Sequence, residues 1–180
     1  MIIGIVGTLG AGKGTVVAYL KEKGFVHYSV SNILKQTALN RGLLPSREVY
    51  TILGDEFRTE NPAGPVAKSY ELFIIEKPDH AIIESIHDVP EALFLREKGA
   101  FIIGVDASIE TRYERIKKRG SEKDNVTFDE FKAIATHEEE GGGKHNIRAV
   151  LEKADYTIEN NGTLEELHAQ VEEILKKIGQ

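Results

Sequence analysis

Short apolar runs recur along the chain and alternate with longer amphipathic stretches. Most of these runs are nearly continuous in Ile and Val, which is typical of parallel strands that are covered on both faces. They predict strands over residues 2–6, 25–30, 81–86, 101–107 and 155–160. The stretches between them carry apolar residues at helical spacing. They predict helices over residues 13–23, 31–41, 46–77 in pieces, 90–98, 109–119, 127–140 and 163–178.

The ends of several predicted helices carry recognisable start and stop residues. Thr163 precedes two glutamates as a candidate N-cap, and glycines stand where helices should end, at positions 24, 42, 99, 120 and 179. Regular alternation of strands and helices predicts an α/β fold, a doubly wound sheet of five parallel strands with helices on both faces. No internal repeat is evident, so we expect residues 1–180 to form a single domain.

Composition narrows the classes of function. The net charge of −6 argues against a sequence-independent nucleic-acid binder, because such a protein needs a basic face. Cysteine is absent, which excludes disulfides, thiolate metal sites and cysteine nucleophiles. The N-terminus lacks the basic region of a signal peptide, and no apolar stretch approaches the roughly 20 residues of a membrane span. We therefore expect a cytoplasmic enzyme or binding module that acts on small molecules.

The stretch GTLGAGKGT, residues 7–15, is a candidate phosphate-binding loop. It follows the first predicted strand and leads into the first predicted helix, which is the context that such a loop requires. Its glycines let backbone N–H groups turn toward phosphate oxygens, and the helix N-terminus adds partial positive charge. Lys13 would reach the phosphates as a compact point charge. A glycine-rich turn without a ligand explains this pattern poorly, so the loop predicts nucleotide binding.

The ending Gly-Lys-Gly-Thr departs from the general pattern, which has Ser or Thr directly after the lysine. In this it resembles the adenylate kinase and nucleoside monophosphate kinase family, whose loop G-x-x-G-x-G-K-G-T is matched at every specified position. The resemblance implies a P-loop NTPase fold, ATP and Mg²⁺ as cofactors, catalysis by Lys13, and a role near Mg²⁺ for the Thr15 hydroxyl. The implied nucleotide contacts are Gly7, Gly10, Ala11, Gly12, Lys13, Gly14 and Thr15.

Two further stretches resemble the acceptor and metal sides of the same family. YSVSNILK (28–35) matches the segment after the second strand, which implies acceptor contacts from Ser31 and from Lys35 in place of an arginine. Ser31 fits a plain helix N-cap equally well. AIIESI (81–86) matches the strand that ends in an acidic residue near Mg²⁺, which implies this role for Glu84. A buried ion pair of Glu84 is the alternative. His87 stands where the family has a phosphate-gripping arginine; a surface histidine is the alternative.

TRYERIKKRG (111–120) resembles the helix that carries one arginine against the adenine ring and another against the transferring phosphate. Arg115 and Arg119 are one turn apart on the same face, and a planar guanidinium suits both stacking and phosphate binding. The resemblance therefore implies a nucleotide contact for Arg115 and catalytic roles for both. A solvated basic face is the alternative, since other cations surround them.

Two variable segments complete the comparison. Residues 31–78 correspond to an acceptor-binding insert, with Arg47 and Arg58 as candidates for the acceptor phosphate; each alone also fits a helix surface charge. Residues 120–147 correspond to the lid over the nucleotides. The family supplies arginines from the lid, whereas this stretch contains none, and Arg148 just beyond is the best substitute.

The C-terminal stretch 154–175, which begins Ala-Asp-Tyr, resembles a neighbouring branch, the dephospho-coenzyme A kinases and the archaeal adenylate-kinase-related proteins. Dephospho-coenzyme A kinases carry an aspartate after the second strand that suits a general base, but YSVSN (28–32) has no carboxylate. Transfer to a phosphate acceptor needs positioning and charge neutralisation instead. We expect transfer of the γ-phosphoryl group of Mg-ATP to a nucleoside monophosphate. A dephospho-coenzyme A kinase-like enzyme, or an ATP-binding sensor or ATPase, stays an alternative. The sequence leaves the acceptor and the oligomeric state open, and a monomer is compatible with it.

Overall fold

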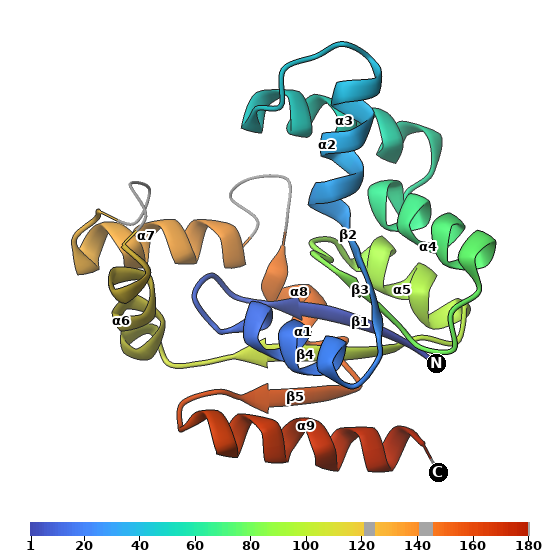
Figure 1. Ribbon diagram of the computed structural model, residues 1–180. Helices are drawn as coiled ribbons and strands as arrows, with labels where there is room; N and C mark the ends of the chain where they lie inside the picture. The colour runs from blue at the N-terminus through green and yellow to red at the C-terminus, as the bar shows by residue number, and fades with distance from the viewer. Residues whose placement is uncertain (121–124, 141–145, 180) are drawn as a thin grey trace.

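Five parallel strands form the centre of the protein in a computed structural model, which describes residues 1–120, 125–140 and 146–179. The strands are ordered β2-β3-β1-β4-β5 across the sheet, so β1 lies in the middle (Figure 1). Their bounds are β1 Ile2–Gly7, β2 Val26–Ser29, β3 Ala81–Glu84, β4 Phe101–Asp106 and β5 Tyr156–Glu159. Every strand predicted from the sequence is present, which confirms the doubly wound α/β fold.

Parallel pairing brings the carboxyl ends of the strands to one edge of the sheet. Ile5 of β1 is aligned with Glu84 of β3, and Glu84 is in turn aligned with Ser29 of β2. Ligands of open α/β sheets bind outside this edge, in the crevice where the strand order reverses. Here that reversal lies beside β1, so the loop after β1 occupies the expected position.

Helices cover both faces of the sheet. α1 (Lys13–Glu22) and α9 (Leu164–Ile178) pack on one face around a core that includes Ile3, Ile5 and Ile103. α5 (Val89–Glu97) and α8 (Ile147–Leu151) contribute to the core on the other face, which includes Ile2 and Val6. Neighbouring residues of β1 thus point to opposite faces, and both faces are apolar. This explains why the strand reads as a continuous apolar run.

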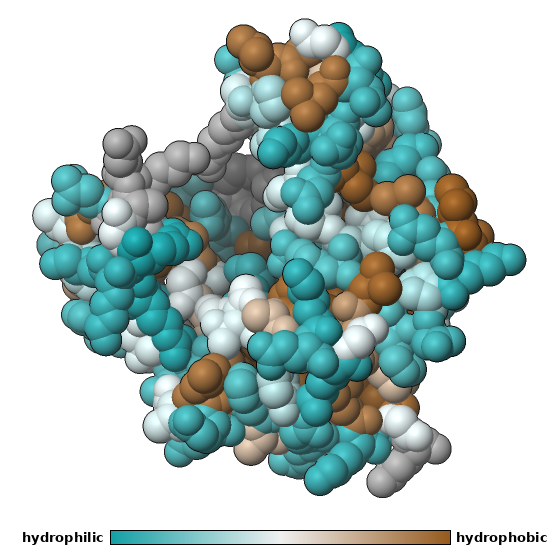
Figure 2. Space-filling model, in the orientation of Figure 1, coloured by the Kyte–Doolittle hydropathy of each residue, from teal (hydrophilic) through white to brown (hydrophobic). Residues whose placement is uncertain are grey.

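Two groups of helices project beyond the carboxyl edge (Figure 1). One is the arm, formed by α2 (Val30–Asn40), α3 (Arg47–Glu60) and α4 (Gly64–Glu76). The other is the pair α6 (Ile109–Arg119) and α7 (Phe128–Glu139), and Figure 2 shows the surface hollowed between it and the arm. The predicted insert at 31–78 corresponds to the arm. Of the predicted lid at 120–147, residues 121–124 and 141–145 lie outside the described residues.

Differences from the predicted helices are local. The helix α8 was not predicted, because its five residues are too few to show helical periodicity. α2 begins at Val30 with Ser29 in the N-cap position, so the interpretation of Ser31 as the N-cap is wrong. Thr163 does cap α9, accepting a hydrogen bond from the backbone N–H of Glu166. In the described part of the chain, no helix has the length and apolar character needed to cross a membrane.

Candidate functional site

The glycine-rich loop connects β1 to α1 at the carboxyl edge, and close packing explains three of its glycines. A Cβ atom on Gly7 would lie 2.2 Å from the carbonyl oxygen of Val105, and one on Gly12 would lie 2.3 Å from Nδ2 of Asn160. Gly10 has a φ of +82° and packs against the backbone of Arg112. Gly14 is different: a Cβ there would meet no protein atom within 4 Å, among the residues that the structure describes.

Lys13 begins α1 and turns back over the loop. Its Nζ donates hydrogen bonds to the carbonyl oxygens of Gly7, at 2.6 Å, and Thr8, at 3.0 Å. Burial lowers the pKa of Lys13, while the nearby Glu84 carboxylate opposes this shift. The lysine is therefore a partly desolvated charge held at the mouth of the loop, where its attraction for an anion is stronger than in water.

The first turn of α1 is left open for an anion. Gly12 is the N-cap residue, no side-chain hydrogen bond caps the helix within the described structure, and the first turn contains no acidic residue. The first N–H groups of a helix have no partner within the helix, and they carry its positive dipole end. These groups, the glycine loop and Lys13 together fit a phosphate chain.

The loop is held from behind by polar side chains that the sequence analysis did not identify. Thr8, which is almost fully buried, donates its hydroxyl to Oδ1 of Asp106 at 2.7 Å. Asn160, equally buried, donates Nδ2 to the carbonyl oxygen of Ala11 at 2.8 Å. Asp106 ends β4 and Asn160 directly follows β5. Their positions at the ends of two predicted strands were the only indication of this role in the sequence, because neither residue belongs to a recognised motif.

Arg115 lies against the same loop. Its guanidinium donates to the carbonyl oxygen of Ala11 at 3.3 Å and to Oδ1 of Asn160 at 3.2 Å. The predicted nucleotide-binding arginine is thus placed beside the loop, half-buried. Arg119, one turn further on at the end of α6, is exposed.

Glu84 ends β3 and faces the loop from the neighbouring strand. Its Oε1 lies 3.3 Å from Nε2 of His27, a residue of β2. The His27 imidazole is the main reason that the pKa of Glu84 lies below its usual range, with smaller contributions from Ser29 and Lys13. The carboxylate is therefore ionised at neutral pH. Ser85, the next residue, has a φ of +68°, an uncommon backbone conformation outside glycine that turns the chain immediately after Glu84.

The oxygens available for a metal ion are those of Thr15 and Glu84. Thr15 is exposed in the first turn of α1, and Glu84 is half-buried at the adjacent strand end. Among the described residues, no group of three or more His, Asp or Glu side chains forms a cation site. Mg²⁺ takes oxygen ligands and commonly keeps water and substrate phosphates in its shell, with only one or two protein carboxylates. The side chains present fit that mode of binding.

The predicted acceptor-binding residues differ in exposure and in the contacts that they make. Ser31 and Lys35 are exposed on α2, and His87 follows β3 with its backbone N–H donating to Glu91 at 2.8 Å. The side chain of Arg47 lies outside the described part of the structure. Arg58 is occupied by carboxylates, with Nη2 2.9 Å from Glu91 and Nε 3.2 Å from Asp88. It fastens α3 to the start of α5, so its predicted phosphate contact would require breaking these ion pairs.

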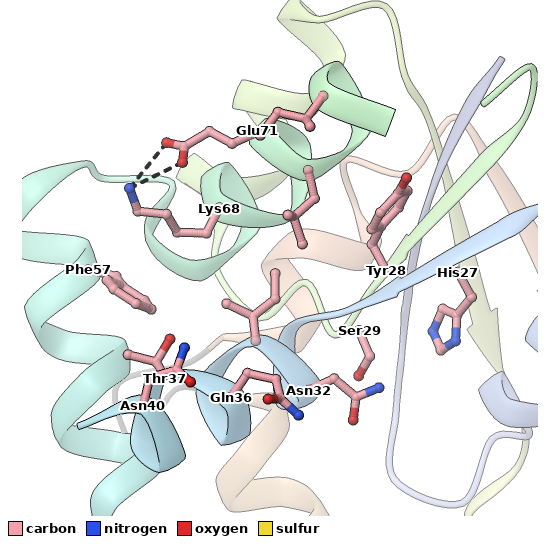
Figure 3. Close-up of a pocket in the computed structure, with 13 residues that line it drawn as sticks. His27, Tyr28, Ser29, Asn32, Gln36, Thr37, Asn40, Phe57, Lys68 and Glu71 are labelled. Carbon is pink, nitrogen blue, oxygen red and sulfur yellow. Dashed lines mark hydrogen bonds and ion pairs between the residues drawn. The ribbon is translucent and has the colours of Figure 1, made fainter. Parts of the chain in front are cut away.

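Beside β2 the arm borders an open pocket of about 370 Å³ (Figure 3). His27 and Ser29 line its end nearest the sheet, and residues of α2, α3 and α4 line the remainder. Because Ser29 is aligned with Glu84, the pocket lies beside the same strand ends that carry the glycine loop.

Comparison with known proteins agrees with this geometry. Residues 3–140 match a family described as AAA domain. The chain is 30% identical to the UPF0200 protein of Pyrobaculum aerophilum, over 98% of each chain. The chain belongs to the UPF0200 family.

Solved structures similar to this UPF0200 chain include kinases. The shikimate kinase of Bacteroides thetaiotaomicron superposes with a TM-score of 0.59 and 13% identity, covering 100% of this chain and 99% of that one. The dephospho-CoA kinase of Campylobacter jejuni superposes with a TM-score of 0.56 and 17% identity, covering 98% of this chain and 96% of that one. These likenesses establish a P-loop kinase-like fold. The specific resemblance to adenylate kinases stays a prediction from the loop sequence.

Proposed function

We propose that this protein transfers the γ-phosphoryl group of Mg-ATP to a nucleoside monophosphate. The observation that carries the proposal is the arrangement at the carboxyl edge of the sheet. There, three adjacent strands bring together the glycine loop with Lys13, the ionised Glu84, and Ser29 at the edge of a pocket. A candidate donor phosphate site and an open pocket thus lie side by side at the carboxyl edge.

The chain's own groups supply the electrostatic part of phosphoryl transfer. The N–H groups of the loop and of the first turn of α1 bind the phosphate oxygens. Lys13 exchanges its two carbonyl partners for those oxygens, and Arg115, already beside Ala11, adds positive charge on the side of α6. Arg119 lies on the same face of α6 and is the second arginine of the proposal. Fixed charges of this kind stabilise the charge that spreads over the transferring group.

Mg²⁺ bound to the phosphates would neutralise their charge and orient them. Thr15 would hold it through its hydroxyl, and Glu84 would hold it through water. For a phosphate acceptor, Lys35 and His87 are the proposed contacts outside the loop, with Arg47 as a further candidate. No general base is needed because the attacking oxygen is already ionised.

One observation favours a second candidate, a kinase for a hydroxyl acceptor of the dephospho-CoA kinase kind. A hydroxyl acceptor requires a general base, and the sequence analysis found no carboxylate near Ser29. The structure places His27 at the wall of the pocket with Glu84 3.3 Å from its Nε2. An imidazole oriented by a carboxylate is a common general base. In this candidate His27→Gln abolishes turnover, whereas a monophosphate kinase keeps it.

A phosphotransfer screen tests the proposal. Purified protein with Mg-ATP is mixed with each ribo- and deoxyribonucleoside monophosphate, and with dephospho-coenzyme A, and ADP formation is followed. We expect ADP formation that depends on one of the monophosphates. Lys13→Ala should reduce it by about 100- to 1,000-fold, the usual effect of removing one charge stabiliser. Lys21→Ala, in the last turn of the same helix, is the matched control.

The other outcomes contradict the proposal in different ways. Turnover with dephospho-coenzyme A alone supports the second candidate. ATP binding without an acceptor-dependent reaction indicates a sensor, and steady ATP hydrolysis without an acceptor indicates an ATPase. Near-normal activity of Lys13→Ala would remove the glycine loop from the reaction altogether.

A further inference from the structure

Three polar groups form a closed triangle at the glycine loop. The carbonyl oxygen of Ala11 accepts hydrogen bonds from Nδ2 of Asn160 at 2.8 Å and from Nη1 of Arg115 at 3.3 Å. Oδ1 of Asn160 accepts from Nη2 of Arg115 at 3.2 Å, which completes the triangle. The carboxamide of Asn160 therefore uses its donor on the loop and its acceptor on the arginine, and it fixes the position of one relative to the other.

The fold encloses the side chain of Asn160. The residue is 5% exposed, and a Cβ atom on Gly12 would approach its Nδ2 to 2.3 Å. Asn160 directly follows β5, so its position is set by the sheet. A buried carboxamide with both of its polar atoms bonded has little freedom to move. It therefore restrains the guanidinium of Arg115 as well.

Arg115 differs from five other arginines in the charge of its partners. Each of those five contacts a carboxylate: Arg41, Arg58, Arg96, Arg112 and Arg148. Within residues 1–120, 125–140 and 146–179, the side chain of Arg115 bonds to neutral oxygens and forms no ion pair. Burial lowers the pKa of its guanidinium, which nevertheless stays charged at neutral pH. The positive charge is thus held in place at the loop without a carboxylate to neutralise it.

We propose that Asn160 is a positioning residue, which holds Arg115 beside the glycine loop through a neutral acceptor and so keeps its charge available for the phosphates of ATP. This inference rests on the proposed function, in which Arg115 contacts the nucleotide. The neutrality of the carboxamide is essential to it. An aspartate would offer Arg115 an oxygen in the same place, but it would neutralise the guanidinium and add negative charge beside the bound phosphates.

Titration of Mg-ATP into the full-length protein, without an acceptor, tests the inference. Arg115→Ala should weaken ATP binding roughly tenfold, the effect of losing one charge-assisted contact. Asn160→Leu approximates the shape of the side chain and removes both of its hydrogen bonds, and it should weaken binding by a similar factor. Combined, the two substitutions should weaken binding no further than Arg115→Ala alone, because Asn160 acts on ATP through Arg115.

The double substitution separates positioning of the arginine from a general effect on the loop. If Asn160 supported only the backbone of the loop through Ala11, Asn160→Leu would weaken ATP binding by the same factor with and without Arg115. Urea unfolding checks that each variant is folded under the conditions of the titration. Asn161→Ala is the matched control, since it removes the adjacent carboxamide, which accepts from the backbone N–H of Ser108. Its affinity for ATP should equal that of the unchanged protein.

Asn160→Asp tests the requirement for a neutral partner, and it decides the question alone if Asn160→Leu does not fold. The carboxylate keeps an acceptor toward Arg115, so the contact with the arginine is preserved. We expect ATP affinity to fall roughly tenfold or more all the same, because the charge of the guanidinium is neutralised.

Two results would overturn the inference. In one, Asn160→Leu weakens ATP binding as much in the Arg115→Ala protein as in the unchanged protein. In the other, Asn160→Asp binds ATP as tightly as the unchanged protein. Because the titration contains no acceptor, neither result bears on the transfer of the phosphoryl group. Conversely, a protein that shows the expected pattern of ATP affinities but phosphorylates no monophosphate would contradict the proposed function and support the role of Asn160.

Discussion

At the scale of single residues, the glycines of the loop differ in whether the fold requires them. Gly7, Gly10 and Gly12 are needed by the fold itself, because a Cβ would collide with Val105, Arg112 or Asn160. Gly14 is helical and borders open space, so nothing in the described protein requires a glycine there. The general phosphate-loop pattern, which has Ser or Thr at this position, accommodates a Cβ atom there as well.

Gly14→Ala makes this distinction measurable. Alanine in a helix is more favourable than glycine by about 0.5–1 kcal/mol, so the substitution should leave the free energy of unfolding unchanged or raise it. ATP affinity should stay close to that of the unchanged protein, because the general phosphate-loop pattern has Ser or Thr, each with a Cβ atom, at this position. Urea unfolding and ATP titration of the same preparation check both expectations. A stably folded variant that no longer binds ATP would contradict this expectation and would show that the nucleotide requires a glycine at this position.

The ionisation of Glu84 should make the stability of the folded protein depend on pH. The folded protein holds the pKa of this carboxyl below its ordinary range, chiefly through His27, so the native state favours the ionised form. The resulting stabilisation is complete above the ordinary carboxyl pKa and is lost as the pH falls through the lowered folded pKa. Glu84→Gln should therefore have a lower Tm than the unchanged protein at neutral pH.

The difference in Tm between these two proteins should shrink on acidification below about pH 4.5, where the unfolded carboxyl takes up a proton. Thermal unfolding of both proteins across the acid range provides the measurement. A gap that stays constant or widens as the pH falls would contradict the assigned ionisation of Glu84.

At the scale of elements, a buried ion-pair network joins three helices behind the glycine loop. Arg112 of α6 donates Nη1 to Oε1 of Glu139 at 2.8 Å, and both side chains are almost fully buried. Arg148 of α8 contacts the other oxygen of Glu139, with about half of its own side chain exposed. Leu9, in the glycine loop, packs against the small core of α6 and α7. The glycine loop is therefore in direct packing contact with α6 and α7.

The two arginines of this network should differ sharply in their effect on stability. Arg112→Ala removes a buried partner and leaves a buried carboxylate with one exposed guanidinium, which we expect to cost about 3–5 kcal/mol. Arg148→Ala removes a largely solvated partner and should cost about 0–1 kcal/mol. Denaturant unfolding of the two variants compares them on the same carboxylate. Equal losses in the free energy of unfolding would mean that burial of the arginine does not determine how much each ion pair contributes to stability.

The α5–β4–β5 region shows how one motif residue is used structurally. Asp155, from the Ala-Asp-Tyr stretch, accepts from the backbone N–H of Ile102 at 2.8 Å and from Arg96 at 2.7 Å. These contacts set the start of β5 beside β4 and the end of α5. The motif that suggested the dephospho-coenzyme A kinase branch thus has a sufficient explanation in strand placement, and it does not by itself identify a substrate.

At the scale of the whole molecule, the sequence predicted what depends on local pattern. Continuous apolar runs marked all five strands, and the glycine spacing marked the loop at residues 7–15. The partners of the loop were not predictable, because Thr8, Asp106 and Asn160 come together only through strand order. The same holds for Arg58, whose partners Asp88 and Glu91 lie about 30 residues away along the chain.

The most direct test of the proposed transfer follows the phosphoryl group itself. The protein is incubated with Mg-ATP labelled at the γ-phosphate and with the monophosphate selected by the screen, and the labelled products are separated. We expect label in a nucleoside diphosphate, with little inorganic phosphate, and about 100- to 1,000-fold slower labelling of the diphosphate by Lys13→Ala. Label that appears only in inorganic phosphate, or on a hydroxyl group of the acceptor, would contradict transfer to a nucleoside monophosphate.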